Sequence, residues 1–236
     1  MDRDDEATTR RRLSRERVVA AALRLVDREG LQGLTMRALG RELGVDPMAV
    51  YHWVPKKDAL LDLIVDAVFL EIPLDVDMVP DGDWMERFGF AARVYRDTLV
   101  RHPNALPVLA TRPTASPAAM KPIEFAVAIL REAGFDPQTA VYGVNAMANL
   151  VIGLVLAWFG LPPGAEAGVT DEERAALFQA LDPNEFPHLA EALRTAEIDF
   201  AEEGRRVVFE LFDRQFEFGM DALMRGMEPL LSEGSG

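Results

Sequence analysis

The side chains best suited to chemistry in this sequence lie close together between residues 37 and 57. Long cationic and hydrogen-bonding side chains can reach phosphates or base edges, and small or slender ones allow close approach to thymine methyl groups. We expect this segment to contact double-stranded DNA, with the two lysines binding phosphate at the start of the next helix. The candidate DNA-binding residues are Arg37, Pro47, Met48, Ala49, Tyr51, His52, Lys56 and Lys57.

Capping residues predict three short helices that would position this cluster. Ser14 is expected to cap a first helix that ends at Gly30, and Thr35 to cap a second. Asp46 would cap a third over residues 47–53, which has a proline at its favoured first position. Two short helices joined by a tight turn are typical of a helix-turn-helix, whose second helix enters the major groove. That recognition helix would be residues 47–53.

Charge is distributed unevenly along the chain. The formal net charge is −14, yet residues 8–57 carry 11 Lys and Arg against 5 Asp and Glu. Residues 58–236 carry 13 Lys and Arg against 30 Asp and Glu. A phosphate backbone would attract the first segment and be repelled by the second. The alternative is that both surfaces only keep the chain in solution.

The rest of the sequence predicts helices and shows no convincing strand alternation, so the expected fold class is all-α. Residues 1–12 have almost no apolar side chains and are expected to be a disordered arm. Residues 13–60 would form a three-helix helix-turn-helix domain, and residues 61–236 a larger helical domain. The helices expected beyond the third are 58–71, 84–101, 104–110, 118–133, 137–159, 187–201 and 205–225.

The stretch 141–159 has no charged residue and approaches the length of a membrane span. It contains Asn145 and Asn149 and lacks flanking Lys or Arg, so we expect a buried core or interface helix and no membrane association. The chain has no cysteine, and its charged N-terminus does not read as a signal peptide. Both features fit a cytoplasmic protein.

Two other classes of function are alternatives to DNA binding. An enzyme would need a catalytic constellation, but His52, His102 and His188 show no nucleophile–base or metal-ligand spacing. His102 and His188 are expected at the surface. The third possibility is a helical protein-interaction adaptor, which would have no ligand-sized cavity.

Residues 21–62, AALRLVDREGLQGLTMRALGRELGVDPMAVYHWVPKKDALLD, resemble the N-terminal domain of the TetR family of transcription regulators. The resemblance implies an all-helical homodimer in which helices 137–159 and 205–225 form a four-helix bundle with their partners. It also implies that Arg37 reads a base, that Tyr51 and Lys57 bind phosphates, and that helix 58–71 transmits a signal from the larger domain.

Residues 111–158 and 216–231 resemble the ligand-binding domain of the tetracycline-responsive members of this family. Residues 61–236 would therefore bind a small-molecule effector and form the dimer. The metal- and drug-binding positions of those relatives align with Pro73, Val108 and Ala157, and one further position aligns near Ala91. Because Mg²⁺ requires oxygen ligands, we expect no metal, no cofactor and no binding of magnesium–tetracycline.

The resemblance also suggests which residues could line an effector pocket. Aromatic and methionine side chains with a few polar groups would suit a mostly apolar small molecule. The alternative for each is an ordinary core position. The candidates are Tyr95, Val108, Thr111, Glu124, Phe125, Asn145, Met147 and Trp158.

Overall fold

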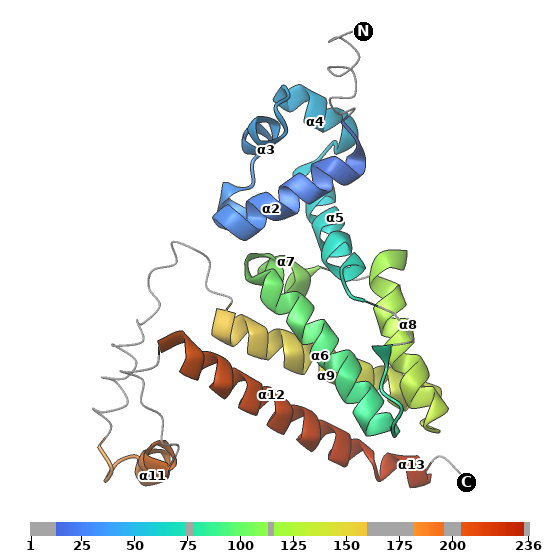
Figure 1. Ribbon diagram of the computed structural model, residues 1–236, viewed down its shortest axis with the longest axis vertical. Coiled ribbons are helices and arrows are strands. Elements are labelled where there is room, and N and C mark those ends of the chain that lie inside the picture. The colour runs from blue at the N-terminus through green and yellow to red at the C-terminus, as the bar shows by residue number, and fades with distance from the viewer. Residues whose placement is uncertain (1–12, 74–77, 113–115, 160–181, 196–203, 234–236) are drawn as a thin grey trace, which may run out of the picture. The chain divides into compact units, whose positions relative to one another are not determined.

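The structure, a computed structural model, describes residues 13–73, 78–112, 116–159, 182–195 and 204–233. Every regular element in these ranges is a helix, which confirms the predicted all-α fold (Figure 1). The expected disordered arm, residues 1–12, lies outside the described residues. The elements are α2 (Arg15–Gly33), α3 (Met36–Leu43), α4 (Pro47–Trp53), α5 (Lys57–Leu70), α6 (Trp84–Arg101), η2 (Pro103–Ala105), α7 (Leu106–Thr111), α8 (Pro117–Glu132), α9 (Pro137–Phe159), α11 (Pro187–Thr195), α12 (Gly204–Met227) and α13 (Leu230–Glu233).

The chain divides into two compact units, one of residues 1–162 with 230–236 and one of residues 163–229. In the first unit, α2, α3 and α4 pack together, and α5 leads from them to α6, α7, α8 and α9 (Figure 1). Helix α5 contacts α2 and also α7 and α8, so it joins the two ends of this unit.

The first three helices begin at the predicted caps. Ser14 Oγ accepts a hydrogen bond from Arg17 N at 3.3 Å, and Thr35 Oγ1 accepts one from Ala38 N at 3.0 Å. Asp46 Oδ1 accepts one from Met48 N at 2.8 Å. Each cap satisfies a backbone N–H that has no partner within its helix, which fixes where the helix begins.

Gly30 does not end the first helix as predicted. It adopts φ 70° and ψ 178°, and the chain then resumes helical structure as far as Gly33. A glycine tolerates this conformation because it has no Cβ. The physical result is a kink within α2 instead of a stop.

The turn between α3 and α4 depends on two glycines. Gly44 ends α3 in the left-handed conformation with φ 68°, as a C-terminal glycine commonly does. At Gly40, a Cβ would lie 3.0 Å from the carbonyl oxygen of Val45 and 3.2 Å from the nitrogen of Pro47. The backbone of the turn therefore packs directly on α3, which sets the position of α4.

A continuous apolar core supports the first unit. Leu39 of α3, Val50 of α4 and Leu60 of α5 are fully buried where these helices meet α2. Farther along, Phe88 of α6 is also fully buried, and Trp84 packs edge-on against Phe135 with ring centroids 5.0 Å apart. The three N-terminal helices and the helices that follow α5 thus belong to one folded unit.

Three boundaries differ from the sequence-based expectations. The expected helix at 104–110 is a turn of 3-10 helix, η2, followed by the six-residue α7. Helix α12 continues past Gly226 to Met227, and α13 follows. The expected helix 187–201 is described only as far as Thr195, as α11.

Helix α9 has the length and hydropathy of a membrane span over Pro137–Trp158, with a mean hydropathy of 1.8. The core helix of a globular protein meets the same criteria. Five of its apolar side chains, at positions 140, 144, 147, 151 and 155, are buried. In the second unit, Phe212, Phe216 and Met220 of α12 are also buried.

Candidate nucleic-acid interface and ligand cavity

The seven residues of α4 include one fully buried side chain and several exposed ones. Val50 is fully buried, whereas Met48 is 71% exposed and Tyr51 is 41% exposed. His52 is also exposed, and its ring packs edge-on against Trp53 at 5.6 Å. Pro47 and Ala49 are half-buried. One residue anchors the helix, and its neighbours are available to a partner.

The cations beside α4 are exposed and unpaired within the described part of the chain. Arg37, Lys56 and Lys57 are exposed and have no ion pair there. By contrast, Arg28 is paired with Glu42 at 2.9 Å. Helix α5 begins at Lys57 with no side-chain cap, so its first N–H groups remain available as well. This arrangement can bind phosphate at a helix N-terminus.

A cavity of about 360 Å³ lies among the helices of the first unit, lined by residues of α5, α6, α7, α8 and α9. Its walls are mostly apolar, and the polar side chains that line it are Tyr95, Arg112, Asn145 and Asn149. A pocket of this size and character is typical of a site for a small molecule.

Four of the candidate pocket residues line this cavity: Tyr95, Phe125, Asn145 and Met147. The other four, Val108, Thr111, Glu124 and Trp158, are not among its lining residues.

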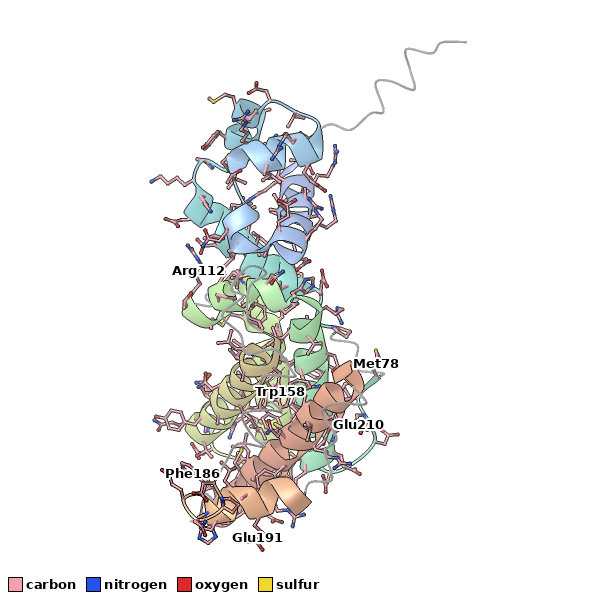
Figure 2. All side chains as sticks on the ribbon, turned by 90° about the vertical axis from the view of Figure 1, so that its left-hand side faces the viewer. Met78, Arg112, Trp158, Phe186, Glu191 and Glu210 are labelled. Carbon is pink, nitrogen blue, oxygen red and sulfur yellow. The ribbon has the colours of Figure 1, made fainter. Side chains whose placement is uncertain are left out.

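Each of these four has a different environment. Val108 is buried at 5% exposure as a core residue of α7. The hydroxyl of Thr111 donates to the carbonyl of Pro107 at 2.6 Å. Glu124 is exposed on α8, and Trp158 lies near the C-terminal end of α9 (Figure 2).

Sequence reasoning missed several lining residues, of which Arg112 and Asn149 are polar. Asn149 follows Asn145 by four positions on α9, so helical periodicity could have indicated it. Arg112 could have been indicated only by its place at the end of α7, next to the candidate Thr111. Phe69 and Ile72 come from the C-terminal end of α5, and nothing in the sequence marks them as pocket residues.

Tyr95 presents an unusual polar group to the cavity. Its side chain is 8% exposed and its ring stacks on Phe69 with centroids 6.2 Å apart. Within the described part of the chain its hydroxyl makes no hydrogen bond. Burial raises the pKa of Tyr95 well above its ordinary value, so the hydroxyl keeps its proton and is a hydrogen-bond donor.

Arg112 connects the cavity to the start of α5. It lines the cavity, and Nη2 also lies 3.0 Å from Asp58 Oδ1. Nη1 donates to the backbone carbonyl of Asp58 at 3.2 Å and to Asp62 Oδ1. Figure 2 labels Arg112 where α7 meets α5.

His102 joins three helices, and the expectation that it lies at the surface is wrong. It is only 7% exposed at the end of α6. Its Nδ1 is 3.0 Å from the carboxylate of Asp27 in α2, and its Nε2 is 2.9 Å from Glu71 at the end of α5. We call these three residues the His102 clamp. Asn104 Nδ2 also donates to the carbonyl of Asp27 at 2.8 Å.

The charge of the clamp follows from its geometry. Burial by itself lowers the pKa of His102, but the hydrogen bonds to Asp27 and Glu71 and their negative charges together raise it above the ordinary value. A doubly protonated ring donates to both carboxylates at once. Below this raised pKa, the clamp is an imidazolium held between two carboxylates.

The four positions that align with the metal and drug ligands of tetracycline-responsive relatives offer no oxygen side chain. Two of them, Pro73 and Ala91, line the cavity. Within the described part of the chain, no group of three or more His, Asp or Glu side chains is placed to hold a metal ion. Pro73 and Ala91 give the cavity wall apolar surface at those positions.

Fold and site together define a helix-turn-helix DNA-binding protein with a ligand cavity in the helices behind its DNA-facing end. Residues 18–64 match the family described as bacterial regulatory proteins, tetR family. Residues 78–231 match the tetracyclin repressor-like C-terminal domain. The chain belongs to the TetR family.

Individual relatives agree with this assignment. An HTH-type transcriptional regulator of Saccharopolyspora erythraea is 35% identical over 79% of this chain and 78% of its own length. The class D tetracycline repressor of Escherichia coli is 30% identical over 94% of this chain and 92% of its own. The structure of the Streptomyces coelicolor TetR family protein ActR in complex with actinorhodin superposes with a TM-score of 0.73 at 27% identity, covering 96% and 100% of the two chains.

The chain is thus a ligand-responsive DNA-binding transcriptional regulator. Members of its family bind DNA operators and small-molecule ligands and are dimeric.

Proposed function

We propose that this protein is a repressor that binds a palindromic operator as a homodimer and leaves it when a small, mostly apolar effector fills the cavity. The observation that carries the proposal is α5, which begins at the exposed Lys57, next to Lys56, and contributes Phe69 to the cavity wall near its other end. Whatever changes the cavity end of this helix also changes the position of its DNA-facing end. The effector must bind the two arrangements with unequal affinity.

In this proposal residues 13–60 read the DNA, with Arg37 at a base and the exposed side chains of α4 in the major groove. Residues 61–236 hold the effector and form the dimer. The protein acts by binding in the cytoplasm and catalyses no reaction, which is consistent with the regulatory function of its relatives.

Operator binding is tested by selecting bound sequences from random double-stranded DNA, where an inverted repeat is expected. Arg37→Ala should weaken binding to the selected site by roughly tenfold or more and relax preference at one base pair. Lys57→Ala should lower the slope of log affinity against log salt by about one. Lys121→Ala, at an exposed position on α8, is the matched control. Unchanged affinity of both variants would refute the assignment of this face.

We further propose that the dimer forms through α9 and α12. Both helices carry exposed apolar side chains, of which Leu156 is 36% and Phe218 is 77% exposed. Leu156→Glu and Phe218→Glu should each yield monomers in sedimentation velocity experiments. Met120→Glu on α8, where the wild-type side chain is 44% exposed, should leave the dimer intact.

The cavity should not bind magnesium–tetracycline, because Pro73, Val108, Ala91 and Ala157 supply no oxygen ligand. Isothermal titration with tetracycline and Mg²⁺ should show no binding in the micromolar range. Micromolar affinity that disappears on chelation of the metal would contradict this part of the proposal.

A further inference from the structure

The two protein groups that could bind polar atoms of a ligand most strongly are Tyr95 and Arg112. The Tyr95 hydroxyl belongs to a buried side chain and has no hydrogen-bond partner within the described residues. None of the described buried side-chain nitrogen or oxygen atoms lacks a hydrogen-bond partner, so this hydroxyl is open to the cavity space, where a ligand acceptor can reach it. Its position therefore favours a ligand with an oxygen acceptor among its rings.

Aromatic side chains form much of the cavity wall. Phe69, Phe90, Tyr95 and Phe125 all line it, and the rings of Phe69 and Tyr95 are nearly parallel, with 17° between their planes. Flat aromatic ligands pack well against such surfaces because offset stacking and edge contacts are both available. The remaining lining is aliphatic or amide, which offers no second charge.

Arg112 is the charged side chain that the cavity presents. A guanidinium has five N–H donors, and three of the bonds from Arg112 go to Asp58 and Asp62 on α5. Two donors therefore remain for another acceptor. Asp58 and Asp62 have side chains 84% and 62% exposed, so water readily solvates them if the guanidinium turns away.

We propose that the cavity binds a planar aromatic acid, with a ring oxygen accepting from Tyr95 and a carboxylate or similarly acidic group on Arg112. That this ligand is the effector rests on the proposed function, whereas its binding to the cavity does not. A carboxylate meets a guanidinium in the planar, charge-assisted geometry that no neutral group matches.

The contact between the ligand carboxylate and Arg112 would also couple ligand binding to the start of α5. Arg112 holds the first two turns of α5 through Asp58 and Asp62, directly after Lys56 and Lys57. A ligand carboxylate competes with these two aspartates for the guanidinium. Its binding loosens the attachment of α5 to α7, and tight attachment in turn opposes ligand binding, because coupling between sites is reciprocal.

Binding is tested by titrating the full-length protein, without DNA, with 9,10-anthraquinone-2-carboxylate and with the corresponding neutral carboxamide. The two probes share three fused rings and ring carbonyls and differ in charge. We expect the acid to bind about tenfold to a hundredfold more tightly than the amide. Arg112→Gln should remove that preference. Asp62→Asn should increase affinity for the acid, because it removes a competing carboxylate.

Tyr95→Phe should weaken both probes by roughly threefold to tenfold, because it removes one hydrogen bond that both accept. Lys121→Gln is the matched control for Arg112→Gln, since it removes a positive charge from the exposed face of α8 outside the cavity. Circular dichroism checks that each variant is folded. Equal affinity for acid and amide, an acid preference that survives Arg112→Gln, or no binding of either probe at millimolar concentration would overturn the proposal.

Experiments with operator DNA distinguish a failure of this inference from a failure of the proposed function. If the acid binds through Arg112 but does not release a selected operator, the ligand assignment stands and its role as effector fails. If the protein selects no DNA sequence, the proposed repressor function fails while the titration result remains valid. Release of DNA by the acid in the wild type, with none in Arg112→Gln, supports both.

Discussion

Replacing His102 by leucine should destabilise the protein in a pH-dependent manner. The change removes two hydrogen bonds to carboxylates, at 3.0 Å to Asp27 and 2.9 Å to Glu71. Hydrogen bonds to charged groups contribute about 1.5–3 kcal/mol each. The Glu71 side chain is 42% exposed, so its share is reduced by water. We therefore expect a total loss of about 2–4 kcal/mol in the free energy of unfolding at low pH.

The direction of the pH dependence follows from the raised pKa of His102. Below the unfolded-state value of about 6.5, the ring is protonated in both states and the full stabilisation is present. As the pH rises through the higher folded-state pKa, the ring loses its second proton and one carboxylate loses its donor. The stability difference between wild type and His102→Leu should be largest near pH 6 and smaller near pH 9.

Urea unfolding followed by circular dichroism at a series of pH values measures this difference. His188→Leu is the control, since His188 is exposed at the start of α11. Its stability should match the wild type at every pH. A loss for His102→Leu that is constant across the range, or that grows as the pH rises, would show that folding does not raise the pKa of the ring.

Three further substitutions test the tight turn between α3 and α4 and the buried side chain of Tyr95. Gly40→Ala should lower stability by about 1–3 kcal/mol and weaken DNA binding, since its Cβ would lie 3.0 Å from the Val45 carbonyl; thermal unfolding and gel shift measure both. Gly44→Ala should cost about 1–2 kcal/mol because φ is 68°, and Gly44→Asn should cost less in the same assay. Tyr95→Phe should leave the midpoint of urea unfolding unchanged or slightly raised, because the hydroxyl makes no hydrogen bond within the described residues. A clearly lower midpoint would show that the hydroxyl has a hydrogen-bond partner in the folded protein.

Local signals in the sequence were sufficient to predict most helices. Ser14, Thr35 and Asp46 act within three residues of their own positions, so the sequence contains all the information that determines these caps. Gly30 shows the limit of such signals. A glycine with positive φ can end a helix or kink it, and packing of the following residues determines which occurs.

The candidate pocket residues were harder to predict because a cavity is defined by contacts between distant segments. Tyr95 and Phe125 line it, while Val108, from a helix that also contributes to the wall, is a core residue that does not. His102 illustrates the same difficulty. Its partners are 75 and 31 residues away in the sequence, and no local pattern brings two carboxylates to one imidazole.

The division of α4 into one buried residue and several exposed ones has an evolutionary consequence. Val50 alone is fully buried in this helix, so stability constrains that position strongly. Met48 and Tyr51 face outward, and surface substitutions of this kind usually change stability by less than about 0.5 kcal/mol. If these side chains read the operator as proposed, gene duplicates could acquire new operator preferences through single substitutions at these positions, without first gaining stability elsewhere. Substitutions at the exposed positions of α4 cost little stability, whereas substitutions at the buried Val50 cost more.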